Sequence, residues 1–212
     1  ELVGCAKFTS EMVNWLAKKS NQIIVITTNP FYPEWKCKNN TYRRSFYRNI
    51  IIIRCPIYVP HKLTGISRSL HYLSFFLSSF PVVIFYGLRK IDIAFSICPT
   101  ILSAPSILIL SLIKRIFIRK KILTWLHFAD LEIEAAFQLK YFRNKHLKNI
   151  LLRYEKKILS SFKFISSISF FMNKKLEQKI NANKEIYYLP DFIETKDFLK
   201  KNKDKKSNPY YK

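Results

Sequence analysis

The sequence predicts an α/β fold of the Rossmann type, with a mainly parallel sheet and helices on both of its faces. Short apolar runs alternate with longer segments of helical periodicity from residue 23 to residue 189. Strands that alternate with helices favour parallel pairing through right-handed crossovers. Hydrophobic residues make up 49% of the chain, which is ample for a core, and 212 residues fit one domain or slightly more.

The first half of the chain carries two predicted helices and two predicted strands. Thr9, Ser10 and Glu11 are typical of a helix start, and the apolar residues that follow lie on one helical face. Residues 67–88 predict a long helix that bends at Pro81, because proline removes a helical hydrogen bond. The predicted strands are 23–28 and 50–56, with a polar, aromatic loop at 31–49 between them.

The second half continues the alternation of strands and helices. Its predicted elements are a strand at 91–97, a helix at 103–115, a strand at 121–127, a helical region at 134–160, a strand at 164–169, a helix at 170–180 and a strand at 186–189. Beyond residue 195 the chain is rich in lysine and loses periodicity. We therefore expect a domain at 1–195 and a linker at 196–212. The opening residues 1–4 are typical of a loop, and we expect a first strand to precede them.

The charge balance narrows the classes of partner. The 37 Lys and Arg residues against 14 Asp and Glu give a net charge of +23, which favours nucleic acid, anionic lipid or a phosphorylated substrate. A solvated surface is the alternative. Three glycines argue against a glycine-rich phosphate loop. The four cysteines form no C-x-x-C pair, so we expect buried free thiols and no metal site.

Two stretches without charged residues raise the question of a membrane. Residues 69–88 and 93–113 both reach the length of a spanning helix. Serines, His71 and Pro81 interrupt the first stretch, and Pro99 and Pro105 interrupt the second. Buried parallel strands also read as continuous apolar runs. We therefore expect a peripheral contact with an anionic leaflet, and an integral protein with two spans is the alternative.

A polar cluster follows the apolar run at 122–126. His127 ends the run, and Asp130, Glu132 and Glu134 come directly afterwards. Ligands of open parallel sheets bind beyond the carboxyl ends of the strands, so this cluster predicts a site for a polar ligand. The alternative is that local backbone groups satisfy these side chains. Glu132 and Glu134 could also cap the next helix, which is the role we favour for Glu134.

Six segments carry a family resemblance. They are residues 1–9 (ELVGCAKFT), 31–35 (FYPEW), 54–60 (RCPIYVP), 73–79 (LSFFLSS), 127–137 (HFADLEIEAAF) and 189–194 (LPDFIE). Together they resemble the N-terminal half of a family 4 glycosyltransferase of the GT-B fold, of the colanic-acid or exopolysaccharide type. The chain departs from the family pattern at Ala6, Ala129 and Asp191, where the family has Gly, Gln and Asn.

The resemblance implies a hexosyltransferase-type enzyme of exopolysaccharide or cell-surface polysaccharide biosynthesis. It implies a nucleotide-sugar donor, which serves as a co-substrate in place of a cofactor, and a lipid-linked saccharide acceptor. The chain would be the acceptor-side domain, and a missing C-terminal domain would hold the donor, so we expect the isolated chain to be inactive. The implied location is cytoplasmic and peripheral, at the inner face of the plasma membrane, with an anionic membrane surface as a partner and no nucleic acid.

The resemblance also suggests roles for single residues. His127 and Asp130 would be catalytic, and Gly4 and Lys7 would offer N–H groups and one positive charge to a diphosphate. The remaining expected substrate-binding residues are Tyr32, Glu34, Trp35 and Glu132. Trp35 is as readily a core plug as a sugar-stacking platform. A basic nucleic-acid-binding or membrane-binding protein without catalytic activity is the alternative to the enzyme.

Overall fold

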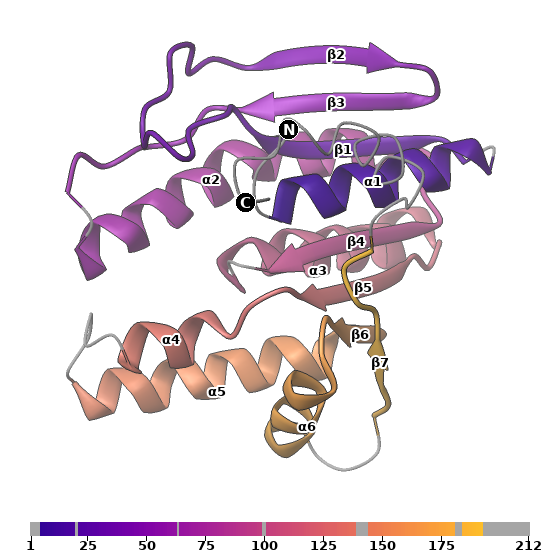
Figure 1. Ribbon diagram of the computed structural model, residues 1–212. Coiled ribbons are helices and arrows are strands. Elements are labelled where there is room, and N and C mark those ends of the chain that lie inside the picture. The colour runs from indigo at the N-terminus through magenta and orange to yellow at the C-terminus, as the bar shows by residue number, and fades with distance from the viewer. Residues whose placement is uncertain are drawn as a thin grey trace, which may run out of the picture.

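The computed structural model describes residues 5–19, 21–62, 64–98, 101–138, 144–180 and 184–192, so Gly4 and the expected linker lie outside the described residues. Its helices and strands mostly alternate, except for the consecutive strands β1–β3 and the consecutive helices α4 and α5 (Figure 1). In chain order they are α1 (Cys5–Lys18), β1 (Ile23–Thr28), β2 (Arg43–Tyr47), β3 (Ile50–Cys55), α2 (Gly65–Gly87), β4 (Ile93–Cys98), η1 (Ile101–Ser103), α3 (Ala104–Ile113), η2 (Lys114–Ile118), β5 (Leu123–Phe128), α4 (Glu132–Gln138), α5 (Lys145–Ser161), β6 (Phe164–Ser167), α6 (Phe170–Lys179) and β7 (Ile186–Tyr188). The mainly parallel sheet flanked by helices confirms the predicted Rossmann-like class.

The strands form two sheets where the sequence predicted one. One sheet has the order β1-β3-β2, with β1 parallel to β3 and β2 antiparallel to it. The other has the order β4-β5-β6-β7, and all of its pairs are parallel. Among the described residues, β1 and β4 each pair along one edge only. An apolar run predicts a strand but does not specify which strands pair with it. The division of the strands into two sheets therefore could not be predicted from the sequence pattern.

Strand β2 lies inside the segment that was predicted to be a loop. Its side chains are all exposed, and its sequence, RRSFY, lacks the apolar alternation of a half-buried strand. A tight turn at Arg48 and Asn49 joins it to β3, since Tyr47 pairs with Ile50. Arg48 adopts a φ of 54°, the left-handed conformation that favours such hairpins. The loop prediction was wrong for residues 43–47.

The helices follow the predicted segments with shifted ends. Helix α1 begins at Cys5, four residues before the predicted start. Helix α2 begins after Thr64, which forms a capping box with Ser67, and it continues through Pro81. The predicted helical region at 134–160 consists of α4 and α5 as separate helices. Helix α1 lies in front of β1 in Figure 1, and α2 lies behind it.

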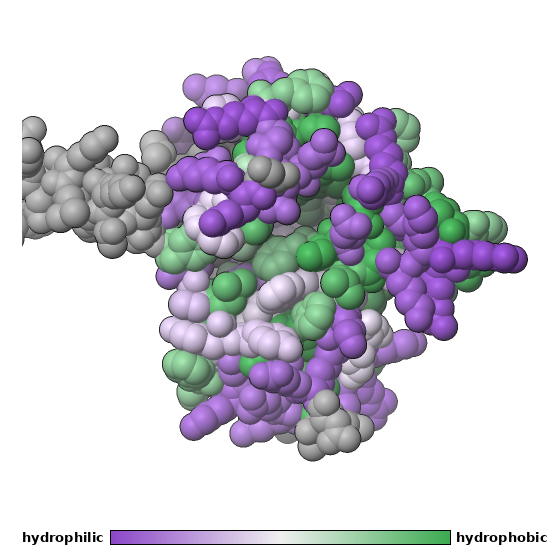
Figure 2. Space-filling view, turned by 90° about the vertical axis from the view of Figure 1, so that its right-hand side faces the viewer, coloured by the Kyte–Doolittle hydropathy of each residue, from purple (hydrophilic) through white to green (hydrophobic). Residues whose placement is uncertain are grey.

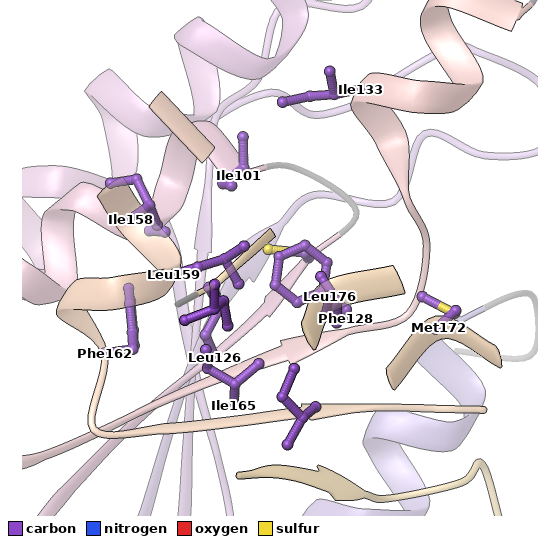
Figure 3. Close-up of a cluster of buried hydrophobic side chains, with 14 of the residues drawn as sticks. Ile101, Leu126, Phe128, Ile133, Ile158, Leu159, Phe162, Ile165, Met172 and Leu176 are labelled. Carbon is purple, nitrogen blue, oxygen red and sulfur yellow. The ribbon is translucent and has the colours of Figure 1, made fainter. Parts of the chain in front are cut away.

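The main core lies between the four-stranded sheet and helices α3, α5 and α6 (Figure 3). Leu126 and Ile165 from neighbouring strands are fully buried against Leu159 of α5 and Leu176 of α6. Burial of each such side chain stabilises the fold by about 1.5–3 kcal/mol. A smaller cluster of Ile53, Cys55 and Tyr86 packs α2 onto the three-stranded sheet. These contacts fix the strands whose ends carry the candidate site.

Candidate functional site

The carboxyl ends of the parallel strands lie on one side of the molecule (Figure 1). The loop after β1 carries Tyr32, Glu34 and Trp35, and the loop after β5 carries Asp130. Lys7 lies in the first turn of α1, and that helix also begins on this side (Figure 1). The structure thus places all the expected site residues that it describes along this side. Gly4 lies outside the described residues.

His127 is the most strongly perturbed group of the candidate site. It lies at the end of β5, is only 7% exposed, and stacks on Phe95 of β4 with ring centroids 5.9 Å apart. Burial lowers the pKa of its imidazole to about 4. His127 is therefore neutral at pH 7, where it can donate one hydrogen bond and accept another.

Ser166 and Trp125 orient the His127 ring. The indole Nε1 of Trp125 donates to the Ser166 hydroxyl at 2.8 Å, and that hydroxyl lies 2.9 Å from His127 Nδ1. Indole nitrogen only donates, so the Ser166 oxygen accepts from Trp125. Ser166 is fully buried and its hydroxyl has no other acceptor among the described residues, so its hydrogen donates to Nδ1. We assign His127 on this ground as the tautomer with its proton on Nε2. The side chain then presents a neutral N–H donor.

Asp130 differs from His127 in being exposed. One oxygen of its carboxylate, Oδ1, accepts a hydrogen bond from the backbone N–H of Leu131 at 2.7 Å. This contact fixes the carboxylate at the start of α4, and its second oxygen remains available to a ligand hydroxyl. Glu132 is the first residue of α4. The neutral donor of His127 and the acceptor of Asp130 thus lie three residues apart at one strand end.

Glu134 forms an ion pair instead of acting only as a helix cap. The ammonium of Lys179, on α6, contacts Glu134 and also lies 2.7 Å from Glu155 Oε2, on α5. Burial raises the pKa of Glu155, although the charge of Lys179 opposes this effect. The three residues join α4, α5 and α6, so their role is to hold the helix that follows Asp130.

The loop after β1 is anchored by buried groups. Trp35 is half-buried and packs against Phe31 and His71, with ring centroids 5.5 and 5.6 Å away. His71, on α2, is itself buried and contacts the carbonyl of Tyr58 through Nδ1. These contacts favour the core-plug interpretation for Trp35. Tyr32 and Glu34 are exposed on the same loop and remain accessible to a ligand.

Three anchoring residues were missed by the sequence analysis. Asn29 at the end of β1 donates to the carbonyl of Thr41 at 2.8 Å, and His71 and Ser166 act as described above. Asn29 stands in an Asn-Pro pair directly after a strand, which indicates a turn but does not indicate that the Asn side chain is buried. Ser166 could be recognised only as one of several serines in an apolar run, because its partners lie 39 and 41 residues away.

Comparisons with known proteins support the resemblance that the motifs suggested. No family model matches the chain. In a match of 195 aligned positions that covers 89% of the chain, the chain is 30% identical to the Escherichia coli (strain K12) protein named "Putative colanic acid biosynthesis glycosyl transferase WcaI". The chain spans about half of that relative, covering 46% of its length. The expected resemblance to the glycosyltransferases of colanic acid biosynthesis is thereby confirmed.

Proposed function

We propose that the chain is the acceptor-side part of a glycosyltransferase of cell-surface polysaccharide biosynthesis. It acts in the cytoplasm at the inner face of the plasma membrane, with a nucleotide sugar as donor and a lipid-linked saccharide as acceptor. The observation that carries this proposal is the similarity over 195 residues to a protein named as a glycosyl transferase. The placement of His127, Asp130 and Lys7 along one side of the molecule supports it.

In the proposed reaction, a hydroxyl oxygen of the acceptor attacks the anomeric carbon of the donor sugar. The bond from that carbon to the diphosphate oxygen breaks, and the nucleoside diphosphate leaves with the bonding electron pair. The hydroxyl proton passes to a base, for which the exposed carboxylate of Asp130 is suited. His127 is suited to orient the acceptor, because its neutral Nε2–H donates to an oxygen without taking up the proton.

Lys7 supplies a positive charge in the first turn of α1, where helix N–H groups also favour an anion. We assign it to the diphosphate of a substrate. Tyr32 and Glu34 border the same side from the loop after β1, and Glu132 borders it from α4. The donor is bound mainly by residues outside these 212, so the isolated chain binds acceptor and transfers no sugar.

Calorimetry with a short-chain prenyl diphosphate monosaccharide tests acceptor binding by the whole chain. Asp130→Asn removes a charged hydrogen-bond acceptor, and we expect at least tenfold weaker binding, since a hydrogen bond to a charged group is worth about 1.5–3 kcal/mol. Asp92→Asn is the matched control, because Asp92 is also exposed but precedes β4, at the amino end of the sheet. Equal affinity of both variants for this ligand contradicts the assignment of Asp130.

A further inference from the structure

The outward stripe of helix α2 is apolar, which is unusual for a helix on a protein surface. The exposed positions of α2 include Ile66, Leu70, Leu73 and Leu77, which follow one another at intervals of four, three and four residues and so share one face. Ile66 is 73% exposed and Leu77 is 61% exposed. No exposed residue of α2 is charged. A surface helix normally presents its polar face to water.

A second apolar stripe lies on the neighbouring helix. Helix α3 packs beside α2, since Gly87 approaches Leu110 so closely that a Cβ there would lie 2.3 Å from its side chain. Leu112 is 55% exposed and Phe117, in η2, is 79% exposed. Both helices lie behind the sheets in Figure 1. We call this surface the α2–α3 ridge; its residues are Ile66, Leu70, Leu73, Leu77, Ile109, Leu112, Ile116 and Phe117.

Positive charges border one end of the ridge. Arg89 and Lys90 follow α2, and Arg115, Arg119, Lys120 and Lys121 lie in or after η2, all of them exposed. Asp92 is the only acidic residue between Trp35 and Ala129. Figure 2 shows hydrophobic side chains beside projecting hydrophilic ones on the face that lies at the right of Figure 1.

We propose that the α2–α3 ridge is a docking surface for an anionic lipid leaflet, with both helices lying in the plane of the interface. Apolar side chains that enter the acyl boundary, next to Lys and Arg at the headgroups, are the pattern of interfacial helices. The basic border fits anionic headgroups, and Asp92 is the single carboxylate among residues 36–128, which is too few for a self-complementary protein interface of this charge. This inference concerns a surface apart from the candidate site.

Helix α2 is long enough and apolar enough to cross a membrane, as is the segment Ile101–Ile118. The inner side of α2 nevertheless packs against the rest of the protein. Tyr86 packs in the core with Ile53 and Cys55, and Ser78 donates to the carbonyl of Pro56 at 2.7 Å. A spanning orientation would break these contacts, whereas an in-plane orientation keeps them and covers the exposed stripe.

Vesicle sedimentation with the whole chain tests the proposal, using phosphatidylcholine vesicles with and without one quarter phosphatidylglycerol. We expect at least tenfold tighter binding to the anionic vesicles at low salt, and weaker binding as salt rises. Arg119→Ser with Lys120→Ser should weaken binding about 30-fold, which is about 2 kcal/mol at about 1 kcal/mol per cation. The control pair Lys157→Ser with Lys174→Ser, also exposed but on α5 and α6, should leave binding nearly unchanged.

A second set of variants tests the contribution of the apolar side chains of α2. Leu73→Ser with Leu77→Ser should weaken binding at least tenfold, whereas Ile150→Ser, at an equally exposed position of α5, should not. Circular dichroism checks that the variants fold. As a second measurement, Leu77→Trp should be quenched by lipids brominated in the acyl chain, and Ile150→Trp should not.

Three outcomes overturn the proposal. They are absence of binding to anionic vesicles, equal losses in the control variants, and a wild-type dimer that the Leu73→Ser, Leu77→Ser variant converts to monomer. The last outcome would assign the ridge to contacts between copies of the chain. Because the assay contains lipid alone, its failure leaves the acceptor-binding proposal standing.

Discussion

At the scale of single residues, burial decides which polar groups can do chemistry. Cys55 and Cys98 are buried outside disulfides, as the sequence predicted, whereas Cys37 is half-buried. Burial raises the pKa of Cys55 to about 11. His127 is buried and neutral, while Asp130 is exposed. The sequence placed His127 and Asp130 at one strand end, but it could not reveal their different environments, because those depend on Phe95, Trp125 and Ser166 from other parts of the sheet.

The lowered pKa of His127 predicts that stability falls in mild acid. Its folded pKa of about 4 lies below the unfolded value near 6.5, so the unfolded chain binds the proton more readily. The stabilisation is complete above about pH 6.5 and is lost as pH falls toward 4, by at most about 3 kcal/mol for this residue. Urea unfolding at several pH values measures the loss.

Two variants assign this pH dependence to His127. In His127→Asn the free energy of unfolding should decline less steeply between pH 6.5 and pH 4 than in the wild type. Part of the decline should remain, because burial also lowers the pKa of His71. His146→Asn removes an exposed histidine and should reproduce the wild-type profile. A His127→Asn profile that matches the wild type would show that the ring is not held neutral by the fold.

At the scale of elements, a buried lysine of η2 binds the carbonyl groups at the C-terminal end of helix α2. Lys114 is 2% exposed, and its Nζ donates to the carbonyls of Gly87 at 2.9 Å and Arg89 at 2.7 Å. Carbonyls at a helix end lack partners within the helix, and a cation there also suits the helix dipole. In the sequence, Lys114 begins a basic run, which is typical of a solvated surface. Its role as a buried donor to the end of α2 therefore could not be predicted from the sequence.

Lys114→Met should therefore destabilise the protein by about 2–4 kcal/mol, because two carbonyls lose a charged donor inside the fold. Lys120→Met removes an exposed lysine six residues away and should change stability by less than about 0.5 kcal/mol. Chemical denaturation of both variants tests this. Similar stabilities of the two would mean that Lys114 contributes no more than a surface lysine.

The elements also show where sequence patterns succeed. The strands β1 and β3–β7 were all predicted, because each has an apolar run bounded by turn residues or by a helix. Strand β2 was missed because it is an exposed edge strand, held by backbone pairing to β3 and by contacts such as that of Arg44 over the ring of Tyr86. The strand order was beyond prediction, since it depends on which edges meet after folding.

At the scale of the whole molecule, the open edges of β1 and β4 make a prediction for hydrogen exchange. Each strand pairs along one edge only among the described residues, whereas β3 and β5 are paired along both. Since alternate backbone amides of a strand point toward opposite edges, about every second amide of β1 and β4 should exchange much faster than those of β3 and β5. Uniformly slow exchange in β1 and β4 would show that another segment pairs with both edges.

The central claim is that a lipid-linked saccharide binds where His127 ends β5. The four histidines offer natural reporters for it, since His71 and His127 are buried, whereas His61, between β3 and α2, and His146, in α5, are exposed. The most direct measurement is nuclear magnetic resonance of histidine-labelled protein, titrated with a short-chain prenyl diphosphate monosaccharide. We expect the ring signals of His127 to shift with saturation while those of His61 and His146 stay in place. Shifts confined to the exposed histidines, or no saturable shift at His127, would contradict it.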